Sequence, residues 1–247
     1  MRTITRSAAW GLLWLAFSAA SYGTTLTITN QPESVNGGGQ FLAYENAMSN
    51  ATFDVYCVDF GNYLTGFKTP FDVNVSTLTA AGIATDADVQ NTRYGITPTG
   101  SFSYAPTAGD AENRYLLAAY LTTQYNFSGG VSAADYAIQD AIWTLLNATK
   151  TPETTNSTST DVNNAIQSAI NWENSLSTTD LNSFASRVEI FTSTSVAGLS
   201  DPARYSNGEQ EYITVLPATS TPEPADMALV GIGLVGLGLL RRRSTRA

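Results

Sequence analysis

The sequence of 247 residues contains no histidine and a single cysteine, Cys57. Without a second cysteine no intrachain disulfide can form. Without histidine, neither a Ser-His-Asp triad nor a Cys-His pair is possible. The same two shortages exclude a zinc site built on histidine or on paired cysteines. We therefore expect no cofactor, no such metal centre and no hydrolase of these two types.

Basic residues are scarce outside the ends of the chain. Residues 24–221 hold six of them against 19 acidic residues, a net charge of −13. A surface of this kind repels phosphates, so we expect no nucleic-acid partner. We interpret the acidity as favouring solubility. Calcium binding is the functional alternative, although the sequence has no Asp/Asn/Gly loop with EF-hand spacing.

Long apolar runs occur only at the two ends. At the N-terminus, Arg2 and Arg6 precede the apolar residues 8–20, and small residues follow. This order is typical of a secretory signal peptide, which we place at residues 1–23. Its presence predicts that the residues after it are exported.

The C-terminal segment, residues 219–247, combines three features. Pro222-Glu223-Pro224 precedes an apolar run of 14 residues at 227–240, and Arg241-Arg242-Arg243 follows. The run is shorter than the roughly 20 residues that span a bilayer comfortably. The arginines should stay on the cytoplasmic side. We therefore expect a short transmembrane helix that anchors the chain transiently in the inner membrane.

This order of features resembles the PEP-CTERM sorting signal of Gram-negative bacteria, over about residues 220–246. The resemblance implies export through the inner membrane and processing near Pro222-Glu223-Pro224 by an exosortase-type membrane protease. It also implies a final place at the cell surface or in the extracellular matrix, where such proteins are linked to extracellular polysaccharide and biofilms. It says nothing about the function of the domain at residues 24–218.

The pattern between the two ends is strands, then helices, then strands, which predicts an α+β fold with one core. We expect a β-sandwich or barrel-like sheet with an inserted helical subdomain. Residues 30–40, with Pro32 and three glycines, are predicted to form a loop, and Asp161 is expected to cap a helix. The predicted strands lie at residues 24–29, 53–60, 71–75, 187–194 and 211–216, and the predicted helices at about 110–123, from 132, from 161 and at 180–186.

A lone cysteine in an exported protein needs an explanation. The simplest one is a buried free thiol that packs as a small apolar side chain. An intermolecular disulfide is a second possibility. A catalytic thiol is disfavoured because no histidine can activate it.

The local sequences point to another role for Cys57. Tyr56-Cys57-Val58-Asp59, together with Gln139-Asp140-Ala141-Ile142-Trp143, resembles the thioester domains of bacterial surface adhesins, over about residues 50–147. That family often has Thr or Ser before the glutamine, where this chain has Ile138. The resemblance implies an internal thioester between Cys57 and Gln139. The protein would then attach covalently to an amine or hydroxyl group on a surface target or to extracellular polysaccharide, once per molecule and without turnover.

Two further residues are candidates for the pocket around that bond. Trp143 is one helical turn from Gln139 and could shield the bond from water. Asp59 shares the predicted strand face of Cys57 and could form hydrogen bonds there or assist proton transfer. Both also have simple structural explanations, as a core side chain and as an acceptor at a strand end. The alternative function is a non-covalent structural or glycan- or protein-binding module with a free buried cysteine.

Overall fold

The structure is a computed structural model that describes residues 22–45, 51–60, 62–64, 66–79, 81–82, 86–95, 111–146, 156–196 and 208–218. The chain divides into two compact units, residues 1–216 and 217–247. Residues 1–21 of the predicted signal peptide, the predicted membrane helix at 227–240 and the sorting motif lie outside the described residues. Within the described part, no helix has the length and apolarity needed to cross a membrane.

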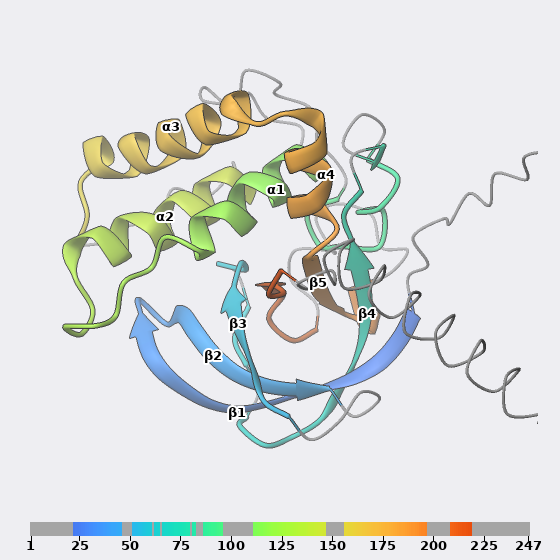
Figure 1. The fold of residues 1–247 in the computed structure, drawn as a ribbon. Coiled ribbons are helices and arrows are strands. Elements are labelled where there is room, and N and C mark those ends of the chain that lie inside the picture. Colours follow the sequence, from blue (N-terminus) through green and yellow to red (C-terminus); the bar gives the residue numbers. More distant parts are fainter. Residues whose placement is uncertain are drawn as a thin grey trace, which may run out of the picture. The chain divides into compact units, whose positions relative to one another are not determined.

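Six strands form a closed antiparallel barrel in the order β1-β2-β3-β6-β5-β4 (Figure 1). Each strand has a partner on both sides, which removes the free edges that an open sheet exposes. The strands are β1 (Tyr22–Val35), β2 (Gly38–Glu45), β3 (Phe53–Cys57), β4 (Phe71–Thr77), β5 (Val188–Ser193) and β6 (Tyr212–Val215).

The barrel interior is a packed apolar core. Side chains alternate along a strand, so Val55 and Cys57 of β3 are fully buried in this core, while Tyr56 between them is only partly buried and Asp54 before them is exposed. The interior cluster also contains Leu26, Ile28, Phe41, Ala43, Val73, Val75, Trp143, Phe191 and Tyr212. Cys57 therefore sits among side chains that exclude water.

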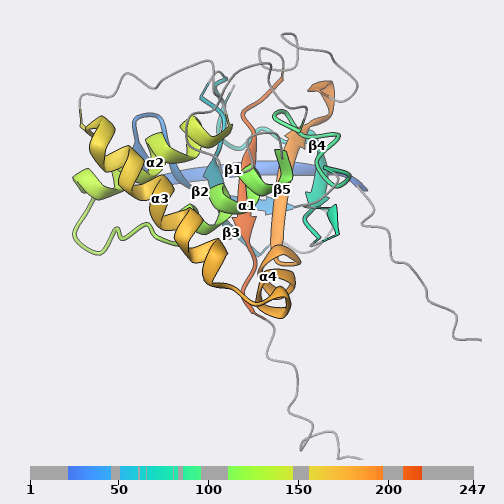
Figure 2. The same ribbon diagram turned by 90° about the horizontal axis from the view of Figure 1, so that it is seen from above.

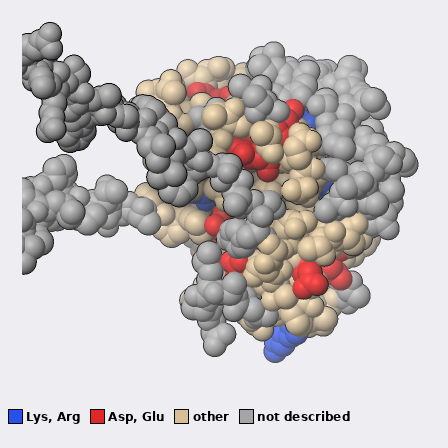
Figure 3. Space-filling model, turned by 90° about the vertical axis from the view of Figure 1, so that its right-hand side faces the viewer, with Lys and Arg blue, Asp and Glu red and all other residues tan. Residues whose placement is uncertain are grey.

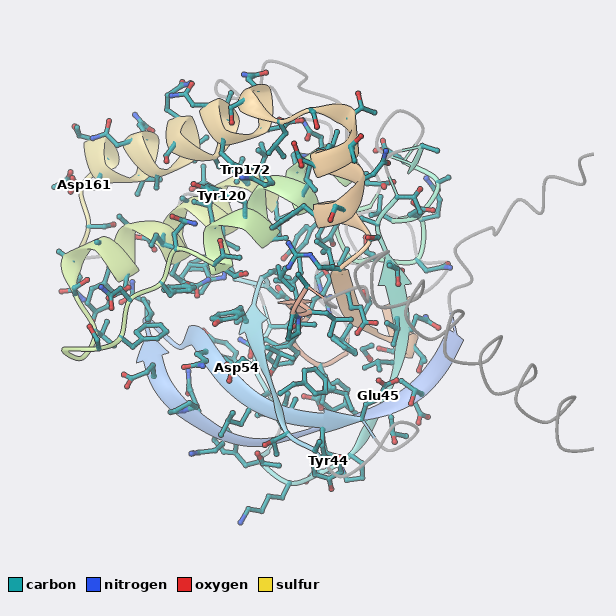
Figure 4. The ribbon with its side chains drawn as sticks, viewed as in Figure 1. Tyr44, Glu45, Asp54, Tyr120, Asp161 and Trp172 are labelled. Atoms are coloured by element: carbon teal, nitrogen blue, oxygen red, sulfur yellow. The ribbon has the colours of Figure 1, made fainter. Side chains whose placement is uncertain are left out.

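Among the described residues, four helices follow β4 in the chain and precede β5: α1 (Ala111–Thr122), α2 (Ala133–Leu146), α3 (Ser159–Ser175) and α4 (Thr178–Ala185). α1 contacts β6 and α2 contacts β1, so these two helices lie over the barrel (Figure 2). α3 packs on both of them, and Tyr120 of α1 stacks on Trp172 of α3 with ring centres 4.2 Å apart (Figure 4). Such a ring pair contributes about 0.5–1.5 kcal/mol beyond its buried area. This arrangement confirms the predicted α+β class. Of the two sheet forms expected, a sandwich or a barrel, the sheet is a closed barrel.

The hairpin between β1 and β2 corrects the loop predicted at residues 30–40. β1 continues to Val35, which pairs with Gly38, and only Asn36 and Gly37 form the turn. Both turn residues have positive φ, 53° and 84°, which suits a two-residue turn between twisted strands. The run of glycines therefore belongs to a tight hairpin, and its last two members begin β2.

The helix starts follow capping chemistry. Ser132 and Asp135 form a reciprocal cap at the start of α2: Ser132 N–H donates to the Asp135 carboxylate at 2.8 Å, and Asp135 N–H donates to the Ser132 hydroxyl at 3.3 Å. At α3 the predicted cap, Asp161, is wrong by three residues. Thr158 is the N-cap, and Asp161 is its partner in a capping box. The Thr158 hydroxyl is the N-cap because it accepts a hydrogen bond from the backbone N–H of the third helical residue, Asp161.

Candidate functional site

Three elements meet where α2 crosses the barrel. β3 ends at Cys57, β2 begins at Gly38, and α2 presents Gln139 and Trp143. Trp143 belongs to the barrel interior, whereas another face of α2 packs with α1 and α3 through Ile138, Ile142, Leu145 and Leu146. α2 therefore has two buried faces, and the one with Gln139 and Trp143 faces Cys57.

The structure brings Cys57 and Gln139 together although 82 positions separate them. Gln139 Nε2 donates to the main-chain oxygen of Cys57 at 3.0 Å, and both side chains are fully buried. The Cys57 thiol donates to the main-chain oxygen of Asp59 at 3.2 Å. Burial raises the pKa of the Cys57 thiol far above its usual range; the charge of Asp59 adds to the rise, and the Trp143 indole opposes it. The sulfur is thus held as a protonated thiol on the residue whose main-chain oxygen accepts from the amide.

The side-chain oxygen of Gln139 has two hydrogen-bond donors. The backbone N–H of Gly39 donates to Oε1 at 2.6 Å, and the hydroxyl of Tyr125 donates to the same atom at 2.7 Å. Together with the contact to Cys57, these bonds fix both ends of the amide group. Donors on the oxygen draw electron density from the carbonyl carbon, which makes that carbon more open to attack by a nucleophile.

Gly38 allows this packing. A Cβ atom at this position would lie 2.8 Å from Gln139 Cδ, from Gln139 Oε1 and from Trp143 Cζ2. Any residue with a side chain would therefore clash with the side chains of Gln139 and Trp143. Glycine at this position is explained by the close approach of the backbone to Gln139 and Trp143.

Tyr125 connects the buried amide to the surface. Its ring is only partly exposed and stacks between Tyr56, at 5.4 Å and 8°, and Phe127, at 5.0 Å and 21°. The backbone N–H of Asn126 donates to Asp135 at 3.0 Å, which ties this segment to the start of α2. The ring stack and the hydrogen bond to the start of α2 therefore together hold the Tyr125 hydroxyl against Gln139.

Asp59 lies next to Cys57, but its carboxylate points into a separate buried network. It accepts from Tyr94 Oη at 2.8 Å and Asn62 Nδ2 at 2.8 Å, and pairs with Arg93 Nε at 2.7 Å. Its main-chain oxygen accepts a hydrogen bond from the Cys57 thiol. The contact between Asp59 and Cys57 thus runs through the backbone, and the carboxylate holds the segment after β3 in place.

Glu211 is the second acid in that network. It accepts from the backbone N–H of Arg93 at 2.7 Å, from Thr192 Oγ1 at 2.5 Å and from the Tyr115 hydroxyl. Burial raises the pKa of Glu211, and the charge of Arg93 opposes the rise. One buried arginine therefore links two carboxylates and secures the start of β6 beside Cys57, since Val58 N–H donates to Glu211 O at 3.1 Å.

Sequence reasoning identified Cys57, Asp59, Gln139 and Trp143 but missed Gly39 and Tyr125. Gly39 acts through its backbone, and Tyr125 follows α1 in a segment without a regular pattern. The run of three glycines was the one available signal for a close approach. The sorting-motif residues Pro222-Glu223-Pro224 and Arg241-Arg242-Arg243 lie outside the described residues. In the described part, no group of three or more Cys, Asp or Glu side chains is arranged to hold a metal ion.

Comparison with known proteins identifies the C-terminal signal. Residues 220–243 match the family model described as the PEP-CTERM protein-sorting motif. No curated protein and no solved structure matches the chain. The match supports a protein that is exported, anchored in the membrane and then processed by an exosortase, a membrane protease.

Proposed function

We propose that this exported protein carries an internal thioester between Cys57 and Gln139 and uses it to attach covalently to a surface target. The observation that carries the proposal is the fixed amide of Gln139. Its nitrogen contacts Cys57, and its oxygen accepts from Gly39 and Tyr125.

The chemistry balances without any added reagent. The Cys57 sulfur adds to the Gln139 carbonyl carbon, the carbon–nitrogen bond breaks, and the thiol proton leaves with the nitrogen as ammonia. An incoming amine then attacks the same carbon, the carbon–sulfur bond breaks, and the sulfur takes up a proton from the amine. The products are a substituted amide at residue 139 and a free thiol at Cys57. Each chain reacts once, so the protein is not a turnover enzyme.

Burial protects such a bond until a target arrives. Cys57 and Gln139 are fully buried and Trp143 is 2% exposed, so bulk water has little access to the carbonyl carbon. Phe60 packs edge-on against Trp143 at 5.0 Å and closes the pocket further. The raised pKa of Cys57 favours the protonated thiol after opening, which makes the opened form stable.

The surface charge favours a cationic target. Acidic side chains are spread over the face drawn in Figure 3, and few basic ones interrupt them. A surface of this sign attracts amines and repels polyanions. We therefore favour an amine-bearing target over an anionic polysaccharide, with hydroxyl groups as the second choice. The sorting motif is consistent with a cell-surface or extracellular destination, where this reaction would take place.

A non-covalent binding module is the second candidate. One observation favours it: all three hydrogen-bond contacts of the Gln139 amide are satisfied without a covalent bond, as in a side chain that pins α2 to the barrel. In that case Cys57 is a buried free thiol. The two candidates predict different masses for the same chain.

Intact-mass measurement of the exported protein separates them. Thioester formation expels one ammonia, so the chain should weigh one ammonia less than its mature sequence, and Cys57 should resist alkylation. Cys57→Ala and Gln139→Ala should each abolish the deficit. Gln167→Ala, at an exposed position of α3, should keep it. A full sequence mass with an alkylatable Cys57 and an unchanged Gln139 would leave the non-covalent module.

A further inference from the structure

The two donors on Gln139 Oε1 form an arrangement that the fold alone does not require. The distance of 2.6 Å from Gly39 N is short for an N–H···O bond, and the distance of 2.7 Å from Tyr125 Oη is typical of an O–H···O bond. They come from the barrel and from the segment between α1 and α2, which are far apart in the sequence. Two donors converging on one carbonyl oxygen in a water-excluded site are the geometry that stabilises a negatively charged oxygen.

Gly39 makes this contact in a backbone conformation that favours glycine. Its φ is +94°, a conformation that residues with a side chain rarely adopt. A Cβ atom would also lie 2.5 Å from the main-chain oxygen of Glu33. Glycine is therefore the residue that lets β2 direct this N–H to Gln139 while β2 stays paired with β1.

Tyr125 is suited to donate over a wide pH range. Burial, with nearby Cys57 and Tyr56, raises the pKa of its hydroxyl well above the ordinary value of 10, so the proton stays on the oxygen. The stack between Tyr56 and Phe127 fixes the plane of the ring. A donor that is held in place before reaction does not have to reorganise when charge develops.

We propose that Gly39 N–H and Tyr125 O–H form an oxyanion hole for the side-chain carbonyl oxygen of residue 139, and that Tyr125 is a catalytic residue of this site. When a nucleophile adds to that carbon, the carbonyl electron pair moves onto Oε1, and the two donors stabilise the resulting oxyanion. When the tetrahedral intermediate collapses, the pair returns, and ammonia leaves in bond formation or the sulfur leaves in bond opening. This inference rests on the proposed thioester.

The inference is tested with Tyr125→Phe, which removes one hydroxyl and keeps the ring in its stack. Tyr56→Phe is the matched control, because it removes a hydroxyl from the next ring of the same stack. Loss of one oxyanion donor in enzymes slows reaction about 10²–10³-fold. We expect methylamine to release the thiol of Tyr125→Phe about 10²-fold more slowly than that of the parent, and the control to react at the parental rate.

A spectroscopic measurement separates this role from a merely structural one. The carbonyl stretch of a thioester labelled with carbon-13 at residue 139 should lie at lower frequency in the native parent than in the denatured parent, and should rise in Tyr125→Phe but not in Tyr56→Phe. The native–denatured comparison needs no variant, so the test survives a failure of Tyr125→Phe to fold. A parent without the ammonia deficit would overturn the proposed function and this inference together. A parent with the bond, whose rate and carbonyl frequency are unchanged in Tyr125→Phe, would overturn this inference alone.

Discussion

Replacing Gly38 by alanine should move the Gln139 amide away from Cys57. The added Cβ would lie 2.8 Å from two atoms of Gln139 and one of Trp143, which is 0.6 Å inside the 3.4 Å at which ordinary contact begins. Because α2 is fixed by its packing on α1 and α3, the clash is relieved chiefly by moving the amide away from Cys57. Overpacking of this size costs about 1–3 kcal/mol. A displacement of about 1 Å at a reacting centre slows a reaction about 10²-fold.

The assay measures the two effects separately. For a domain of this size, 1–3 kcal/mol corresponds to a fall of roughly 2–12 °C in Tm. The fraction of chains lacking one ammonia should fall sharply in Gly38→Ala under the same expression conditions. Gly129→Ala is the control, since a Cβ there meets nothing within 4 Å. A Gly38→Ala protein with the parental Tm and the full mass deficit would refute the close approach of β2 to Gln139.

Three further changes probe other parts of the chain. Burial and the charge of Asp88 raise the pKa of Glu112 from 4.5 to about 8, so the stability that its protonated form provides below pH 4.5 should be lost as the pH rises to about 8. In denaturant unfolding, the free energy of unfolding of Glu112→Gln should depend less on pH than that of the parent. An equal pH dependence of the two proteins would contradict the burial of this carboxyl. Asp59→Ala removes the carboxylate that pairs with the buried Arg93 guanidinium and should destabilise the fold by about 3–5 kcal/mol. A Tm within 2–3 °C of the parent, less than about 1 kcal/mol, would show that the pair contributes little. Neutral residues in place of Arg241–Arg243 should disturb retention at the inner membrane, measured by fractionation, and sorting identical to the parent would remove the arginines from the signal.

Local patterns in the sequence were enough to predict the helices of the described part, five of its six strands and half of the site. Strand β2 was missed because its first residues are glycines, which indicated a loop. Apolar alternation marked β3, and an apolar stripe with a capping pair marked α2, so Cys57 and Gln139 could be placed on a strand and a helix. Barrel closure could not be predicted in this way. It depends on the pairing of β1 with β4 and of β3 with β6, which is set by register between distant segments.

The missed residues share a physical cause. The contribution of Gly39 is a backbone N–H, which every residue except proline carries, so residue type does not reveal it. Tyr125 and Arg93 act through contacts with residues 14 and 118 positions away. The direction of the Asp59 carboxylate was equally hidden, since β3 ends at Cys57 and the predicted strand alternation no longer applies two residues later.

The most direct measurement is the chemical identity of residue 139 after the exported protein has been treated with isotopically labelled methylamine. A thioester predicts the labelled amide at this position, a free thiol at Cys57 and neither change in Cys57→Ala. Glutamic acid at residue 139 in the untreated parent would likewise show that the bond had formed and been hydrolysed. An unlabelled, unchanged glutamine in the freshly purified parent would contradict the covalent function.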